Sequence, residues 1–227
     1  MDSYRGNRRG TRRRKTARRK EGIRRKYAAA GLLILVILTI TLGIRSCISG
    51  RGYRVDVDAS QPEIDVQLLD INPFSRPGIE SDGITGIVIH YTANPGSTAQ
   101  ENRDYFNGLQ YSQETEASSN FIVGLEGEII QCVPTWEVAY ASNERNSDTV
   151  SIEVCHPDET GKFTEETYRS LVQLTAWLCV KFELTEKDVI RHYDVTGKIC
   201  PKYFVEDENA WEDFRTDVGR AIQKTRS

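Results

Sequence analysis

The sequence predicts an α/β fold, on the border of α+β, in which one mixed central β-sheet is flanked by helices. Two observations lead to this prediction. Short apolar runs rich in β-branched residues, typical of buried strands, alternate with stretches in which apolar residues recur every three or four positions, typical of helices. Ahead of them, residues 28–44 form a run of seventeen residues without a charge, which adds one transmembrane helix before the domain.

The N-terminal region differs sharply in charge from the rest of the chain. Residues 1–26 carry thirteen Lys or Arg and two acidic residues, which leaves 17 basic and 31 acidic residues in 27–227. A basic run is also found in nucleic-acid-binding tails, but this one stops directly before the apolar stretch, which favours a membrane explanation. We therefore expect no nucleic-acid partner and a single-pass protein of the cell membrane, with its N-terminus in the cytoplasm.

Four segments are expected along the chain. They are a basic cytoplasmic tail (1–26), a transmembrane helix (27–45), a stalk with several breakers (46–80) and a folded domain on the cell-wall side (81–227). No Ala-x-Ala cleavage site follows Ile44, and Arg45 fits poorly into a lipoprotein signal ending at Cys47. An uncleaved anchor is the expectation.

Strands are predicted first at residues 86–91, a short and strongly apolar run. Residues 120–124 and 128–132 flank Gly127 and have the pattern of a β-hairpin. Residues 150–155 and 188–192 are further extended runs.

Helices are predicted between these strands. The first covers about 97–109 and is capped by Ser97 or Thr98. The second begins after Thr164, and the third ends the chain. Their apolar faces consist of Tyr168, Leu171, Val172, Thr175, Leu178, Cys179 and Phe182 in the second, and Trp211, Phe214, Val218 and Ile222 in the third.

Five cysteines make an odd number, so complete pairing within one chain is impossible. Cys132 and Cys155 both fall in predicted strands, where a disulfide is conceivable. Cys179 is interpreted as a small buried hydrophobic residue.

A metal site is suggested by two of the three histidines. His90 ends one apolar strand, His192 follows another, and Cys200 comes eight residues later. Two imidazoles and a thiolate can hold zinc and leave a fourth position open. On spacing alone the signal is weak, and a core histidine and a buried thiol are the commoner interpretations. Lys198 lies two residues before Cys200 in a segment made extended by Pro201, so both side chains could face one cavity.

Glu153 stands out because it lies inside an otherwise apolar or small strand. Burial of a carboxylate without a partner costs free energy, so this residue needs an explanation. A salt bridge or an edge-strand charge would provide one, and a catalytic role would provide another.

Four motifs in order, at 87–93, 117–131, 150–154 and 192–201, resemble the type 2 N-acetylmuramoyl-L-alanine amidases. This family includes phage lysozyme-type amidases and the peptidoglycan-recognition proteins. The resemblance implies an amidase-like domain and zinc bound by His90, His192 and Cys200, with Cys200 where other members have Asp. It implies hydrolysis of the amide bond between N-acetylmuramic acid and L-alanine in peptidoglycan.

The resemblance also implies catalytic roles. Glu153 matches the family's general base, and Lys198 matches the lysine that stabilises the developing oxyanion. The chain departs from the family at Ser119, near the position of the phage enzymes' catalytic tyrosine. His156 precedes a proline in an expected loop and has no ligand role in the family, so it is left out of the site.

A substrate groove is expected beside the metal. Its predicted residues are Tyr91, Asn94, Trp136 and Tyr140, whose aromatic and amide groups suit sugar faces and peptide backbones, although each could equally be structural. Muropeptides are the expected partner and a monomer the expected state. The alternative function is a non-catalytic, membrane-anchored receptor that binds peptidoglycan; the presence of Glu153, Lys198 and Cys200 together argues against it.

Overall fold

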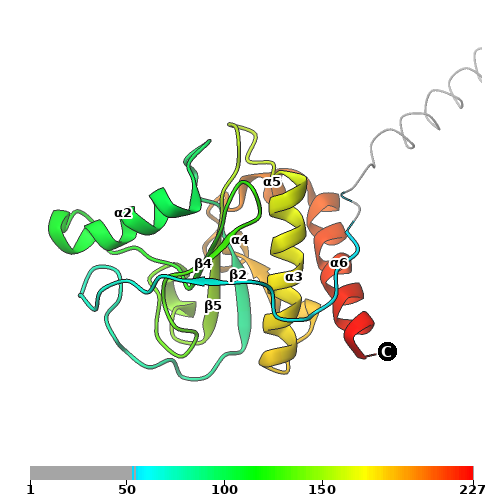
Figure 1. Cartoon of the computed structure of the whole chain (residues 1–227), viewed down its shortest axis with the longest axis horizontal. Coiled ribbons are helices and arrows are strands. Elements are labelled where there is room, and N and C mark those ends of the chain that lie inside the picture. The colour runs from blue at the N-terminus through cyan, green and yellow to red at the C-terminus, as the bar shows by residue number, and fades with distance from the viewer. Residues whose placement is uncertain (1–52, 54, 227) are drawn as a thin grey trace, which may run out of the picture. The chain divides into compact units, whose positions relative to one another are not determined.

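The computed structural model describes residue 53 and residues 55–226, which form one compact unit. The elements follow one another in this order: β1 (Asp65–Val66), β2 (Gly86–Ile89), α2 (Ala99–Ser112), β3 (Phe121–Val123), β4 (Ile129–Gln131), η1 (Asn143–Arg145), β5 (Thr149–Val154), α3 (Glu165–Lys181), η2 (Glu186–Asp188), β6 (Val189–Arg191), α4 (His192–Thr196), α5 (Lys202–Glu206) and α6 (Glu208–Arg226). Figure 1 shows their arrangement.

The strands of this region form one mixed sheet in the order β1-β4-β3-β5-β2-β6. All neighbouring pairs are parallel except the β3–β4 hairpin, which is antiparallel. The predicted single mixed sheet with flanking helices is therefore confirmed. The strand β2 is buried along its whole length because it lies inside the sheet between β5 and β6.

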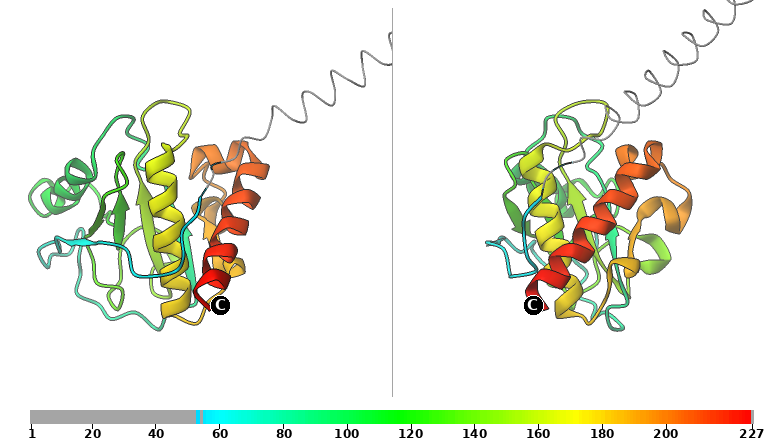
Figure 2. Two further views of the ribbon diagram at one scale, coloured as in Figure 1. Left: turned by 45° about the vertical axis from the view of Figure 1, so that its right-hand side comes forward. Right: turned by 90° about the vertical axis from the view of Figure 1, so that its right-hand side faces the viewer.

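One face of the sheet is covered by α3 and α6, which lie side by side in Figures 1 and 2. Val150, Ile152 and Val154 of β5 point to this face and belong to the larger apolar core. The predicted faces of both helices supply the rest of this core. Tyr168, Leu171, Val172, Leu178, Cys179, Trp211, Phe214, Val218 and Ile222 are all buried there, with Phe182 packed at its margin. We call this side the helix-covered face.

The opposite face is covered only in part. The helix α2 packs on β3 and β4, where its Phe106 and Leu109 join Ile122 and Ile130 in a second, smaller core. Its N-terminus is fixed by Thr98, whose hydroxyl accepts the Glu101 N–H in a capping box, as one of the two predicted caps requires. The helix α2 does not cover β5, β2 and β6. We call this side of the sheet the open face.

Part of the segment 46–80, expected to be a stalk and entry segment, packs on the domain. Residues 65–66 form β1 and pair with β4, and Leu69 is buried under α2. Arg76 makes a bidentate ion pair with Glu137 over 2.8 Å. These residues pack on the domain because their sparse apolar side chains fill positions at the sheet edge, which a local pattern of breakers does not reveal.

The first and last described residues meet on the helix-covered face. The Tyr53 ring stacks on Tyr168 with its centroid 3.9 Å away, and the Ala59 N–H donates to the Thr225 hydroxyl over 2.6 Å. Lys224 forms an ion pair with Asp56 over 2.7 Å. The described part of the chain therefore begins and ends beside α3 and α6.

The predicted tail and transmembrane helix, 1–26 and 27–45, lie outside the described residues. Among the helices of the described part, none has the length and apolar character needed to cross a membrane.

Candidate metal centre

Three neighbouring parallel strands point their carboxyl ends to the same edge of the sheet. Ile89 of β2 pairs with Ile152 of β5 on one side and with Arg191 of β6 on the other. The residues that follow these three in the chain are His90, Glu153 and His192. Because ligands bind beyond the carboxyl ends of parallel strands, this edge is the natural place for a site.

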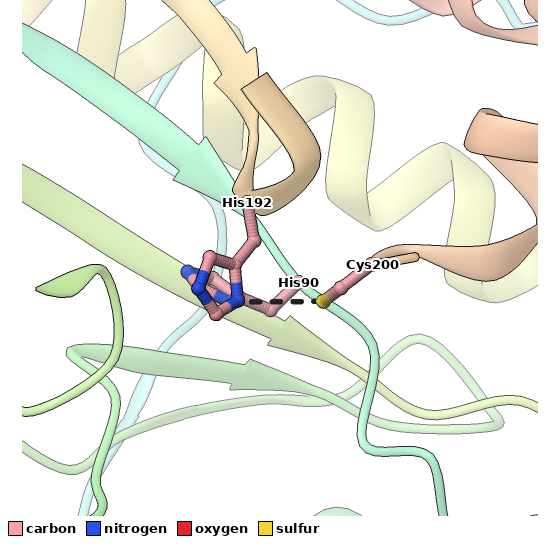
Figure 3. A group of neighbouring side chains, drawn as sticks. All are labelled: His90, His192 and Cys200. Atoms are coloured by element: carbon pink, nitrogen blue, oxygen red, sulfur yellow. Dashed lines mark hydrogen bonds between the residues drawn. The ribbon is translucent and has the colours of Figure 1, made fainter. Parts of the chain in front are cut away.

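His90, His192 and Cys200 converge at this edge (Figure 3). One ligand atom of each lies within 4.8 Å of the others, and all three residues are buried. The two ring centroids are 4.7 Å apart, and the Cys200 Sγ is 3.8 Å from Nδ1 of His90. The predicted ligand set is thus brought together in space, although its members lie up to 110 residues apart in sequence.

Cys200 reaches the cluster by a short return of the chain. The helix α4 ends at Gly197, whose φ of 77° suits glycine, and the Tyr193 N–H then donates to the Cys200 carbonyl over 2.9 Å. The Arg191 guanidinium holds this return in place, because it binds Asp194, Glu208 and the Phe204 carbonyl. The thiol is therefore presented by a braced loop.

Burial controls the ionisation of the three groups. It lowers the pKa of His90 well below its ordinary value, with help from the charges of His192 and Lys198, and it lowers the pKa of His192 as well. Burial, together with the Glu153 charge, raises the pKa of the Cys200 thiol to about 12. Neutral imidazoles are the ligand form of histidine, and a cation among these groups would favour the thiolate. The donor set therefore fits zinc.

Glu153 lies on the open face beside this cluster. Its Oε2 is buried and has no hydrogen-bond partner. Burial raises its pKa to about 8, an effect that the positive charge of Lys198 partly opposes. The salt bridge considered from the sequence is not formed, because no ion pair of the described region includes Glu153.

Lys198 is exposed, but its charge acts on the whole cluster. It lowers the pKa of both histidine ligands and of Glu153. Its place beside the metal centre, expected from the spacing to Cys200, stays a prediction.

The predicted groove residues are spread around the cluster rather than gathered in it. Tyr91 follows His90, is half-buried, and stacks on His156 with ring centroids 5.1 Å apart. Asn94 is exposed, and its carbonyl caps the turn before α2. Tyr140 lies two residues before Ser142, whereas Trp136 is 64% exposed and no described contact joins it to the cluster.

Ser119 is placed where it cannot reach a substrate. It is fully buried, and its hydroxyl donates to the carbonyls of Phe121 and Ser151 over 2.8 and 3.0 Å. Asn120 completes this network by accepting the Ser151 N–H. Ser119 thus supports the sheet, and the role of the phage enzymes' tyrosine is not taken over by its hydroxyl.

The cysteines of the described region are free thiols. Cys132 and Cys155 both belong to the smaller core, and burial raises the pKa of each to about 12. The conceivable disulfide between them is therefore not formed.

Two residues that contact the ligands were not identified from the sequence. The Ser142 hydroxyl lies 3.1 Å from Nε2 of His90, and Oδ1 of Asn143 lies 3.0 Å from Nε2 of His192. Both lie in the polar loop before β5, where nothing in the local pattern distinguishes them from solvent-exposed turn residues.

Comparison with known proteins relates this chain to one family of enzymes. The profile of the N-acetylmuramoyl-L-alanine amidase family matches residues 80–203, which include all three members of the cluster, Glu153 and Lys198. A Bacillus licheniformis protein, N-acetylmuramoyl-L-alanine amidase CwlL, is 34% identical over 177 residues, covering 70% of this chain and 49% of that protein. N-acetylmuramoyl-L-alanine amidase BlyA of Bacillus subtilis is 30% identical over 182 residues, covering 69% and 48%. The chain thus spans about half the length of the curated relatives it matches.

Solved structures agree in fold. The catalytic domain of XlyA superposes with a TM-score of 0.60 at 22% identity, covering 70% of this chain and 100% of that one. The structure of PlyL superposes with the same TM-score at 21% identity, covering 70% and 99%.

Proposed function

The chain belongs to the N-acetylmuramoyl-L-alanine amidase family, and we propose that it hydrolyses the amide bond between N-acetylmuramic acid and L-alanine in peptidoglycan, with zinc held by His90, His192 and Cys200. One observation carries this proposal. The two imidazoles and the thiol converge beside an unpartnered carboxylate at the carboxyl edge of three parallel strands. A receptor that only bound glycan would have no use for a carboxylate whose Oε2 is buried without a partner.

Zinc, when bound, would polarise the amide carbonyl and lower the pKa of a water molecule at the site. Glu153 accepts the proton of the attacking water, since its Oε2 is engaged by no other group of the described protein. A pKa near 8 in the metal-free protein suits a group that takes up a proton and later delivers it to the leaving amine.

Lys198 balances the negative charge that develops on the carbonyl oxygen. Its charge already acts on Glu153 and on both histidines, so it lies within electrostatic reach of the reacting atoms. Tyr91, Asn94, Trp136 and Tyr140 remain candidates for contacts with glycan and stem peptide. Of these, Tyr91 is the best supported, because it directly follows His90 in the chain.

The test is hydrolysis of purified peptidoglycan by the full-length chain in detergent, followed as the release of L-alanine amino groups. Chelator should abolish release, and added zinc should restore it. Cys200→Ala should be inactive, whereas Cys179→Ala, which alters an equally buried thiol in α3, should stay active. Metal-independent binding with no release would support the receptor instead.

We also propose that residues 28–44 anchor the protein in the cell membrane with the tail 1–26 in the cytoplasm. The uncharged run of seventeen residues behind thirteen basic ones supports this orientation. Full-length protein should stay with membranes after alkaline extraction, and its domain should be digested by protease added from the outer side. Release of the protein by alkali would contradict the anchor.

A further inference from the structure

Ser142 and Asn143 are consecutive residues, and each contacts a different histidine of the metal centre. The Ser142 Oγ is 3.1 Å from Nε2 of His90, and the Asn143 Oδ1 is 3.0 Å from Nε2 of His192. In both rings it is the same nitrogen that is engaged. One short loop therefore contacts the outer side of both ligands.

The contact with Asn143 decides which nitrogen of His192 carries the proton, because an amide oxygen only accepts hydrogen bonds and Nε2 must donate. A histidine that binds a metal is neutral and has one N–H, so Nδ1 of His192 is left with a free lone pair. The Ser142 hydroxyl could donate to Nε2 of His90 or accept from it. It is Nδ1 of His90 that faces the Cys200 thiol, 3.8 Å away, and a free lone pair there requires the proton on Nε2. Both rings and the thiol point towards one another in Figure 3.

The loop is itself held rigidly. The Asn146 Oδ1 accepts the N–H groups of Ala141 and Ser142 over 3.1 and 2.5 Å. The Arg145 N–H donates to the Ser142 carbonyl over 3.0 Å, and the Asn146 N–H donates to the Asn143 carbonyl over 3.1 Å. These bonds close a single tight turn around the two contact residues.

Asn143 has a backbone conformation that fits this task. Its φ is 53°, in the left-handed region that Asn enters more readily than most residues. This conformation starts η1 and directs the side chain back towards α4, on which His192 lies. Ser142, in contrast, is buried with His90, so its hydroxyl is withheld from competing water.

We propose that Ser142 and Asn143 are positioning residues of the metal centre: each accepts the Nε2–H of one histidine, so that both rings present Nδ1 to the metal. This rests on the proposed function, since it assigns how that zinc is held. Such outer contacts fix the tautomer and the orientation of a ligating histidine.

The first test measures zinc affinity of the full-length chain in detergent by competition with a chromogenic chelator. Ser142→Ala and Asn143→Gly should each weaken zinc binding about 10- to 100-fold, the range known for such contacts. Glycine at 143 keeps the positive φ and removes only the amide. Asn143→Asp should retain affinity, because a carboxylate accepts the same bond. Ser147→Ala is the matched control, since the Ser147 hydroxyl makes no hydrogen bond among the described residues.

The second test reads the tautomers of the metal-free protein from imidazole ¹⁵N chemical shifts at neutral pH. Wild-type His90 and His192 should carry their proton on Nε2, and each variant should shift only its own histidine towards a tautomer mixture. A proton on Nδ1 in the wild type, or unchanged zinc affinity in both Ser142→Ala and Asn143→Gly, overturns the proposal. If wild-type chain binds no zinc, the proposed function fails, and the tautomer measurement still decides the role of the two residues.

Discussion

The two faces of the sheet use the same strands for opposite purposes. On the helix-covered face, β5 contributes Val150, Ile152 and Val154 to a continuous apolar core. On the open face, the alternate positions of the same strand are Ser151, Glu153 and Cys155, of which Glu153 has a buried oxygen without a partner. Stability is thus concentrated on one side, and polar groups that cost stability are placed on the other.

The effect of a substitution on activity or stability should therefore depend on which face of the sheet it alters. Changes on the open face should reduce catalysis while the fold persists, and changes on the helix-covered face should lower stability while the folded fraction keeps its activity.

The largest effect is expected for His90→Ala on the open face. Loss of one of three ligands should lower kcat/KM about 10³-fold or more, which corresponds to about 4 kcal/mol of transition-state stabilisation. Circular dichroism of the metal-free variant should still show the native fold at 25 °C. An active variant would exclude His90 from the centre, and an unfolded one would show that the two faces are not separable.

A slightly smaller effect is expected for Leu171→Ala on the helix-covered face. Leu171 is fully buried in α3, so its truncation should lower the free energy of unfolding by about 3 kcal/mol in urea titrations. At temperatures where the variant is folded, its zinc affinity and kcat/KM should match the wild type. A loss of zinc affinity would mean that packing behind the sheet controls the site in front of it.

The third prediction concerns Glu153→Gln and pH. The pKa of Glu153 is raised from 4.5 to about 8, so between these values the folded protein holds a proton that the unfolded chain has released. The free energy of unfolding of the metal-free wild type should therefore fall as pH rises through this window. The variant lacks this dependence and should be more stable than wild type at pH 8 by about 2 kcal/mol, with little difference at pH 4.

The same variant should lose activity about 10²-fold or more, because the proton acceptor is gone. Higher stability with lower activity would show that the Glu153 carboxylate lowers the free energy of unfolding and is needed for catalysis. Equal stability of both proteins at pH 8 would show that Glu153 is not held in an unfavourable environment.

Much of the fold follows from local patterns. The runs that became β2, β3, β4, β5 and β6 are apolar and short, and the periodic stretches became α2, α3 and α6 with Thr98 and Thr164 as their caps. The strand β1 was missed because it has two exposed residues, and only its pairing with β4 makes it a strand. The packing of residues 55–80 depends on such distant partners throughout.

The site residues can likewise be divided into those that local patterns predict and those that depend on distant contacts. His90 and His192 could be placed at strand ends and Glu153 inside a strand, but their common level depends on the sheet order β5-β2-β6, which no local pattern contains. The contacts of Ser142 and Asn143 depend on a loop folding over that edge. Polar loop residues look alike in sequence, and only the folded chain separates those that face a ligand from those that face water.

Both described ends of the chain are fastened behind the sheet, by the stacking of Tyr53 on Tyr168 and by the bond from Ala59 to Thr225. The described residues ahead of β1 are therefore held by helices that come much later in the chain. Removal of the last turn of α6, which contains Thr225, should also loosen the segment around Ala59.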